Sequence, residues 1–216
     1  MRTFKWRTDS CIYSSIWRDY IAGVVLEDPP VFSAEGEDWE NSFAYLDTYK
    51  PLHEYNKSEK TECWPAYYLR NCYWGQLFMA NSMDGIANYA QKYSESHPGE
   101  EVKICFLPSS VTGIFHYVVD YDFQYGEHFY DLSWNHGYTH KEILSAIDVP
   151  CIYIHAKEGI ADTGVYLCAA SREQAERAVA FIGDNCRMIE TSDSDHAIHS
   201  SYSDVYIDAV NSLLNQ

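Results

Sequence analysis

The residues best suited to chemistry lie near the C-terminus, in the run Asp-His-Ala-Ile-His at positions 195–199. An imidazole changes protonation near neutral pH and serves as a general base. The run follows a short apolar stretch, Arg187–Ile189, and precedes Tyr206–Leu214, whose apolar residues recur at helical spacing. This order puts His196 at the carboxyl edge of a parallel sheet, where α/β folds bind ligands. We predict that His196 is a general base; the alternative is a histidine that only caps the last helix or pairs with a carboxylate.

Such a base needs a carboxylate to orient it, and the sequence offers several. Asp28 ends the apolar run Ile21–Leu26, and the two prolines that follow force the chain out of the sheet. Glu158 and Asp162 follow the second predicted strand, Cys151–His155. Asp28 and Asp162 are the two candidates for the catalytic acid. Each is equally explained as a surface carboxylate of an acidic protein, and Asp28 also as a turn residue.

The sequence contains no nucleophile motif to match this base. A G-x-S-x-G turn needs two glycines four positions apart, and no pair among the eleven glycines has that spacing. Ser10 and Cys11 come closest in chain position, but neither a strand nor a glycine surrounds them. A metal site built on His196 and His199 is a further alternative, yet no third ligand is suggested by spacing. We expect no metal and no other cofactor.

The elements that must position His196 are predicted from periodicity and capping. Thr139-x-x-Glu142 is a capping box that starts a short helix, and strand Cys151–His155, helix Ser171–Ile182 and strand 187–189 follow. This alternation predicts parallel strands joined by helical crossovers. Residues 33–138 are instead dense in Trp and Tyr. Helices are expected there over Asp38–Tyr49, Pro65–Gln76 and Asp84–Ser94, with a further short one at Ile12–Tyr20.

Composition bounds the class of protein. The net charge of −17 and the pI near 4.7 argue against binding of nucleic acids and anionic membranes. No apolar run approaches the roughly 18 residues of a membrane helix, and the basic start is not followed by the apolar core of a secretory signal. Seven cysteines without a C-x-x-C pair fit a reducing compartment, so we expect a cytoplasmic protein.

Several segments in order resemble the C-terminal half of the α/β-hydrolase superfamily. The run Val-Val-Leu-Glu-Asp-Pro-Pro at 24–30 is similar to the end of strand six in lid-bearing members. The run at 195–199 is similar to the family's (G/D)-H-x-I-H segment, whose first His is the base. Segments resembling the approach into strand seven are Tyr130-x-x-Ser133-Trp134, Lys141–Leu144 and Val149–His155.

The resemblance implies a partial parallel sheet of an α/β-hydrolase fold with an inserted helical cap. Residues 1–32 would be a remnant of the hydrolase core, 33–138 the cap and 139–216 the rest of the core. His196 would be the base, His199 a flanking residue, and Asp28 or Asp162 the acid. The family's H-G-x-x-D after strand seven is replaced by His-Ala-Lys-Glu-Gly at 155–159. The nucleophile is expected near Phe4–Trp6, where no Ser or Gly occurs.

Two functional hypotheses follow. The first is a serine-hydrolase relative that cleaves esters or similar acyl bonds of a small apolar substrate under the cap, catalytically incomplete as this chain. The second is a non-catalytic module that binds an apolar ligand in the aromatic segment or a partner, including a second copy, at an open sheet edge.

Overall fold

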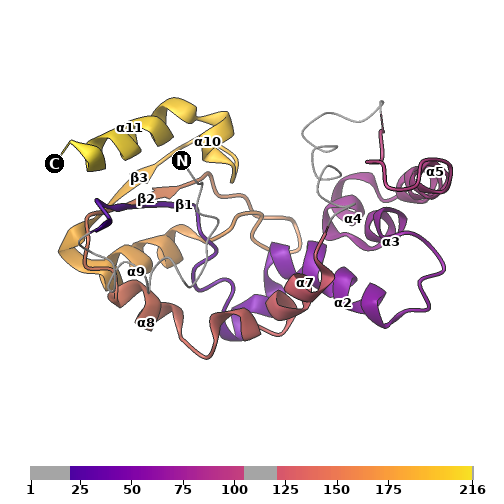
Figure 1. Cartoon of the computed structure of the whole chain (residues 1–216), viewed down its shortest axis with the longest axis horizontal. Helices are drawn as coiled ribbons and strands as arrows, with labels where there is room; N and C mark the ends of the chain where they lie inside the picture. Colours follow the sequence, from indigo (N-terminus) through magenta and orange to yellow (C-terminus); the bar gives the residue numbers. More distant parts are fainter. Residues whose placement is uncertain (1–19, 105–120, 216) are drawn as a thin grey trace. The chain divides into compact units, whose positions relative to one another are not determined.

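The computed structural model describes residues 20–104 and 121–215, and the chain divides into two compact units (Figure 1). We call Met1–Phe43 together with Trp134–Gln216 the sheet unit, and Ala44–Ser133 the helical unit. The predicted helix at Ile12–Tyr20 lies almost wholly outside the described residues, and so do Ser10 and Cys11. Among the described helices, none combines the length and apolar composition that a membrane crossing requires.

Three parallel strands form the sheet of the sheet unit, in the order β1 (Val24–Glu27), β2 (Cys151–His155), β3 (Cys186–Glu190). All five residues of the central strand β2 are buried. A strand covered on both faces reads as a nearly continuous apolar run, as β2 does from Cys151 to Ile154. The predicted mixed α/β architecture with a parallel sheet is therefore confirmed.

Helices cover both faces of this sheet (Figure 1). On one face, Tyr153 of β2 packs in a cluster with residues of α8 (His140–Ser145) and α9 (Arg172–Ile182). On the other face, Ile152 and Ile154 pack with α10 (Ile198–Ser201) and α11 (Ser203–Leu214). Burying one such side chain contributes about 1.5–3 kcal/mol. Alternation along β2 thus divides the core into two apolar layers.

Capping residues set where the helices of the sheet unit begin and end. The capping box predicted at Thr139 and Glu142 is present at the start of α8. A second capping box, between Ser171 and Gln174, opens α9. Gly183 ends α9 with a φ of 80°, a left-handed conformation that glycine adopts without strain, and a short 3₁₀ turn, η6 (Gly183–Asn185), leads into β3.

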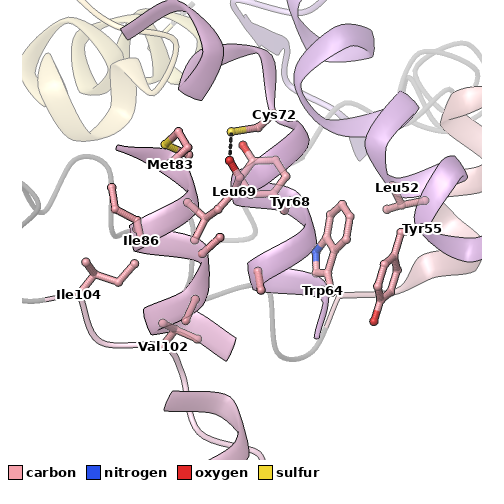
Figure 2. Packing of buried hydrophobic residues seen from close by; sticks show 13 residues of the cluster. Leu52, Tyr55, Trp64, Tyr68, Leu69, Cys72, Met83, Ile86, Val102 and Ile104 are labelled. Atoms are coloured by element: carbon pink, nitrogen blue, oxygen red, sulfur yellow. Dashed lines mark hydrogen bonds between the residues drawn. The ribbon is translucent and has the colours of Figure 1, made fainter. Parts of the chain in front are cut away.

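The helical unit has its own apolar core. Its elements are η3 (Tyr45–Tyr49, a π-helical turn), α2 (Lys50–Lys57), α3 (Trp64–Asn71), α4 (Tyr73–Met79), α5 (Met83–Ser96) and α7 (Phe123–Tyr130). Figure 2 shows the core, in which Trp64 and Leu69 of α3 and Ile86 of α5 are buried together. The packing explains why the many aromatic residues of this segment are retained without a sheet: they fill the space between short helices.

The helix predicted over Pro65–Gln76 is broken in the structure at Cys72, whose ψ is 139°. The buried carboxylate of Asp47 accounts for the break. Its Oδ1 accepts the backbone N–H of Trp74 at 2.7 Å, and its Oδ2 accepts the hydroxyl of Tyr68 at 2.6 Å. Burial raises the pKa of Asp47, and these bonds oppose that rise. The carboxylate therefore binds an N–H at the start of α4 that a continuous helix would have used itself.

The helix predicted over Asp38–Tyr49 is also different. A 3₁₀ helix, η2 (Gly36–Asn41), ends at the extended residue Ser42, and η3 then leads directly into α2. The helical unit runs from Ala44 to Ser133, within the segment predicted as an insertion over 33–138. Ser33 donates to the carbonyl of Ala169, and Asp38 accepts from Gln174. Both contacts hold this stretch in the sheet unit.

His140 is a buried structural histidine at the start of α8. Its Nδ1 accepts the backbone N–H of Phe32 at 2.8 Å, which requires that nitrogen to be unprotonated. Burial, reinforced by the charge of Arg177, lowers the pKa of His140 to about 4. A neutral ring thus joins α8 to the segment that follows β1.

This arrangement predicts a loss of stability in acid. The unfolded chain binds a proton at His140 near pH 6.5 and the folded chain only near pH 4, so stability from this group is complete above 6.5 and lost as the pH falls. Relative to the variant His140→Asn, the wild type should lose about 3 kcal/mol of its advantage in unfolding free energy between pH 7 and pH 4. Urea denaturation at each pH measures it, with His136→Asn, at an exposed position, as the control. A pH-independent difference would contradict this role.

Candidate active site

Asp28 follows β1 directly and is buried, with 1% of its surface exposed. Its backbone N–H donates to the carbonyl of Ile154 at 2.8 Å, which extends the ladder to β2 by one bond. Its φ of 36° turns the chain out of the sheet, and Pro29 and Pro30 follow. Aspartate tolerates this left-handed region better than most residues that carry a Cβ. The turn places the side chain of Asp28 at the C-terminal ends of the strands.

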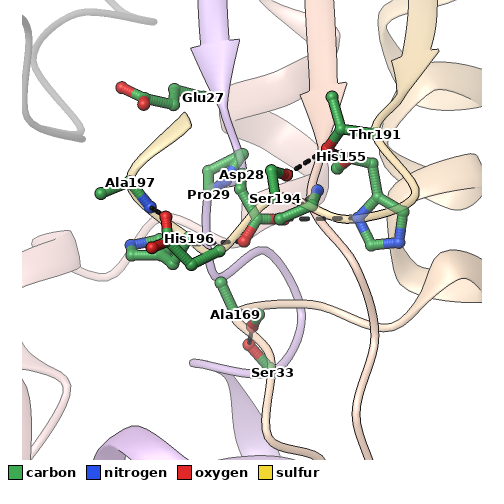
Figure 3. Close-up of polar contacts among 12 residues, drawn as sticks. Glu27, Asp28, Pro29, Ser33, His155, Ala169, Thr191, Ser194, His196 and Ala197 are labelled. Carbon is green, nitrogen blue, oxygen red and sulfur yellow. Dashed lines mark hydrogen bonds and ion pairs between the residues drawn. The ribbon is translucent and has the colours of Figure 1, made fainter. Parts of the chain in front are cut away.

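Three groups from two other segments surround the carboxylate of Asp28 (Figure 3). The N–H of Ala156 donates to Oδ1 at 3.1 Å, and the Nδ1 of His155 lies 3.3 Å from the same oxygen. The Nδ1 of His196 lies 2.9 Å from Oδ2. Burial alone would raise the pKa of Asp28, but the contacts with His155, His196 and Ala156 outweigh it and lower the pKa. Asp28 is therefore a buried anion at neutral pH.

His196 lies on the loop between β3 and α10, with 66% of its side chain exposed. A carboxylate only accepts hydrogen bonds, so Nδ1 of His196 carries the proton that Asp28 binds. The hydrogen bond to Asp28 raises the pKa of His196; burial opposes it, and the charges of Asp28, Glu27 and Asp195 add to it. In the neutral ring, Nε2 then has a lone pair available to accept a proton.

A second carboxylate–histidine pair lies beside the first. Oε1 of Glu27, the last residue of β1, accepts both the backbone N–H of His199 at 2.6 Å and its Nδ1 at 2.7 Å. Consecutive residues of the chain thus hold the two imidazoles of the 195–199 run. Asp195 closes the loop from within by accepting the N–H of Ala197 at 3.0 Å. These contacts leave the His196 ring little freedom to leave the sheet edge.

His155 is the member of the cluster that sequence reasoning missed. It ends β2, only 3% of its surface is exposed, and its Nε2 has no hydrogen-bond partner among the described residues. One sequence signal was available: a polar residue closes an otherwise apolar strand beside the strand that leads to Asp28. Its Nδ1 lies 3.3 Å from Oδ1 of Asp28, and the ring packs beside that carboxylate without a hydrogen bond of good geometry.

The other predicted acids do not join the cluster. Asp162 is exposed in the loop after β2 and, among the described residues, makes no hydrogen bond or ion pair with His196. Glu158 accepts the backbone N–H of Arg172 at 2.5 Å, which caps the first turn of α9. The structure thus brings Asp28, and not Asp162, to His196.

The geometry of His196 and His199 does not fit the alternative of a metal site built on these two histidines. His196 and His199 each point Nδ1 at a different carboxylate, Asp28 and Glu27. Within residues 20–104 and 121–215, no three His, Cys, Asp or Glu side chains are grouped to hold a metal ion.

Comparison of the chain with models of known protein families and with curated protein sequences finds no match. The chemistry of the site is therefore argued from its own geometry.

The pKa of His196 should depend on Asp28. In Asp28→Asn the ring loses the anion that stabilises its charged form, so the pKa of His196 falls below its wild-type value, while the amide oxygen still accepts the Ala156 N–H. NMR titration of the imidazole protons measures the shift. Asp162→Asn is the matched control and should leave the titration unchanged. A fall in Asp162→Asn with none in Asp28→Asn would contradict the pairing.

Proposed function

We propose that Asp28 and His196 are the acid and base of an acyl-transfer site of the serine-hydrolase type, in a chain related to the α/β-hydrolase superfamily. The observation that carries the proposal is the 2.9 Å contact between a buried carboxylate and Nδ1 of a ring that is otherwise exposed. Its place at the carboxyl edge of a parallel sheet adds support, because ligands bind at that edge in α/β folds.

The proposed chemistry follows from the two ring nitrogens. Nε2 of His196 takes the proton of an attacking serine hydroxyl, and Asp28 stabilises the imidazolium that forms. The serine oxygen bonds to the acyl carbon, and Nε2 then returns the proton to the leaving alkoxide. The raised pKa of His196 favours the first transfer, because a stronger base accepts the proton more readily.

The 216-residue chain is proposed to be catalytically incomplete by itself. It contains no G-x-S-x-G, so these residues supply the acid and base without the strained turn that exposes a nucleophile. Without an activated serine and its oxyanion hole the covalent route is closed. The proposed substrate of the complete site is a small apolar ester, and the high negative charge of the chain disfavours anionic ones.

Partner binding is the second candidate function, and one observation favours it. In the part of the chain that the structure describes, β1 pairs with β2 alone, so its second edge has no strand partner. Such an edge is a template for a further strand from another chain, including a second copy. Concentration-dependent dimer formation, measured by light scattering and lost on Val25→Pro, would favour this function over catalysis.

Labelling with a fluorophosphonate, which reacts preferentially with an activated serine, tests the hydrolase proposal. The chain itself should not be labelled. The coding sequence upstream of Met1, translated in all three frames, should contain G-x-S-x-G. The polypeptide extended by that segment should be labelled. In that polypeptide, Asp28→Asn should lower kcat for p-nitrophenyl butyrate on the order of 10⁴-fold, as loss of the triad aspartate does elsewhere.

Asp162→Asn is the matched control in the extended polypeptide and should retain full activity. Stoichiometric labelling of the 216-residue chain, lost on His196→Ala, would contradict its proposed incompleteness. Upstream sequence without the motif, or an active polypeptide indifferent to His196→Ala, would overturn the hydrolase proposal itself.

A further inference from the structure

Two cysteines face each other at the start of neighbouring strands. Cys151 is the first residue of β2 and Cys186 the first of β3, and the two are direct partners in the parallel register. Both belong to the apolar cluster on the α8–α9 face of the sheet, so their side chains project to the same side. Neither is in a disulfide in the structure.

This placement satisfies the main geometric requirement of a disulfide. Paired residues of neighbouring strands lie about 4.8 Å apart, within the range of about 4.4–6.8 Å between Cα atoms that disulfides span. By contrast, Cys63 and Cys72 flank α3, whose eight residues are about 12 Å long at 1.5 Å each.

The two thiols differ in access and in reactivity. Cys186 is half-buried on an edge strand, whereas only 2% of the surface of Cys151 is exposed. The hydrogen bond with Cys151 lowers the pKa of Cys186, although burial opposes it. Cys186 is therefore the thiol that a reagent in solution reaches, and its lowered pKa favours the reactive thiolate, whereas Cys151 is shielded from solvent.

We propose that Cys151 and Cys186 form a dithiol site that exchanges with a small disulfide of the glutathione class and closes into a cross-strand disulfide. The Cys186 thiolate attacks one sulfur of oxidised glutathione, forming a mixed disulfide and releasing one glutathione thiolate. Cys151 gives up its proton and attacks the Cys186 sulfur, releasing the second glutathione. Two protein thiols are oxidised, one glutathione disulfide is reduced, and the two thiol protons leave on the two glutathiones.

The disulfide would fasten β3 to the central strand at the edge of the sheet opposite to Asp28. Closing the β2–α9–β3 crossover removes conformations from the unfolded chain, so the oxidised form should melt at a higher temperature. This inference does not rest on the proposed hydrolase function, because neither thiol touches the candidate active site.

Incubation of the folded chain with a series of reduced and oxidised glutathione mixtures tests the site. After acid quenching and before any alkylation, intact mass should fall by about 2 Da at the more oxidising ratios, the mass of two hydrogen atoms. Peptide mapping should show Cys151 joined to Cys186. The melting temperature, followed by circular dichroism, should rise in step with that product.

Single substitutions separate the two roles. In Cys151→Ser the reaction should stop at one glutathione adduct on Cys186. In Cys186→Ser neither that adduct nor the fall of about 2 Da should appear. Cys168→Ser is the matched control and should form the same link as the wild type. In the wild type, unreacted thiols at every ratio, a stable glutathione adduct without ring closure, or a link to a different cysteine would each overturn the proposal.

Discussion

The sheet unit depends on the contacts that the buried carboxylate of Asp28 makes with its neighbours. A buried anion is tolerated only with close partners, and here Ala156, His155 and His196 supply them. The carboxylate therefore requires the end of β2 and the loop after β3 to stay where they are. Three segments that are far apart in the sequence are joined at one sheet edge.

The same contact gives the site its chemical character. Because Nδ1 of His196 binds a buried anion, the opposite edge of the ring points outward. That edge carries Nε2, which has a lone pair when the ring is neutral. Glu27 holds His199 three residues later and so restrains the loop from its other side. An exposed imidazole would otherwise sample many orientations. The sheet thus places the two carboxylates, and the carboxylates fix the orientation of His196 as a base.

Local patterns predict much of the sheet unit and less of the helical unit, where the helix predicted over Asp84–Ser94 is confirmed as α5 (Met83–Ser96). Apolar runs predict β1 and β2, and Thr139 with Glu142 predicts the start of α8, because each signal lies within a few residues. The break at Cys72 depends on Asp47, more than twenty residues away, and no local pattern reports it. The sequence also leaves Asp28 and Asp162 as alternatives, although the prolines after Asp28 constrain it more tightly. Only the strand register brings His155 and His196 to Asp28.

The tautomer of His196 tests the central claim most directly. Two-bond ¹H–¹⁵N correlation NMR of the imidazole, recorded above the pKa of His196, distinguishes which nitrogen carries the proton. A ring held by Asp28 should be protonated at Nδ1 and bare at Nε2, the reverse of the preference of a free histidine side chain. Protonation at Nε2 in the folded chain would mean that Asp28 does not orient the ring, and the acid–base pair would have to be abandoned.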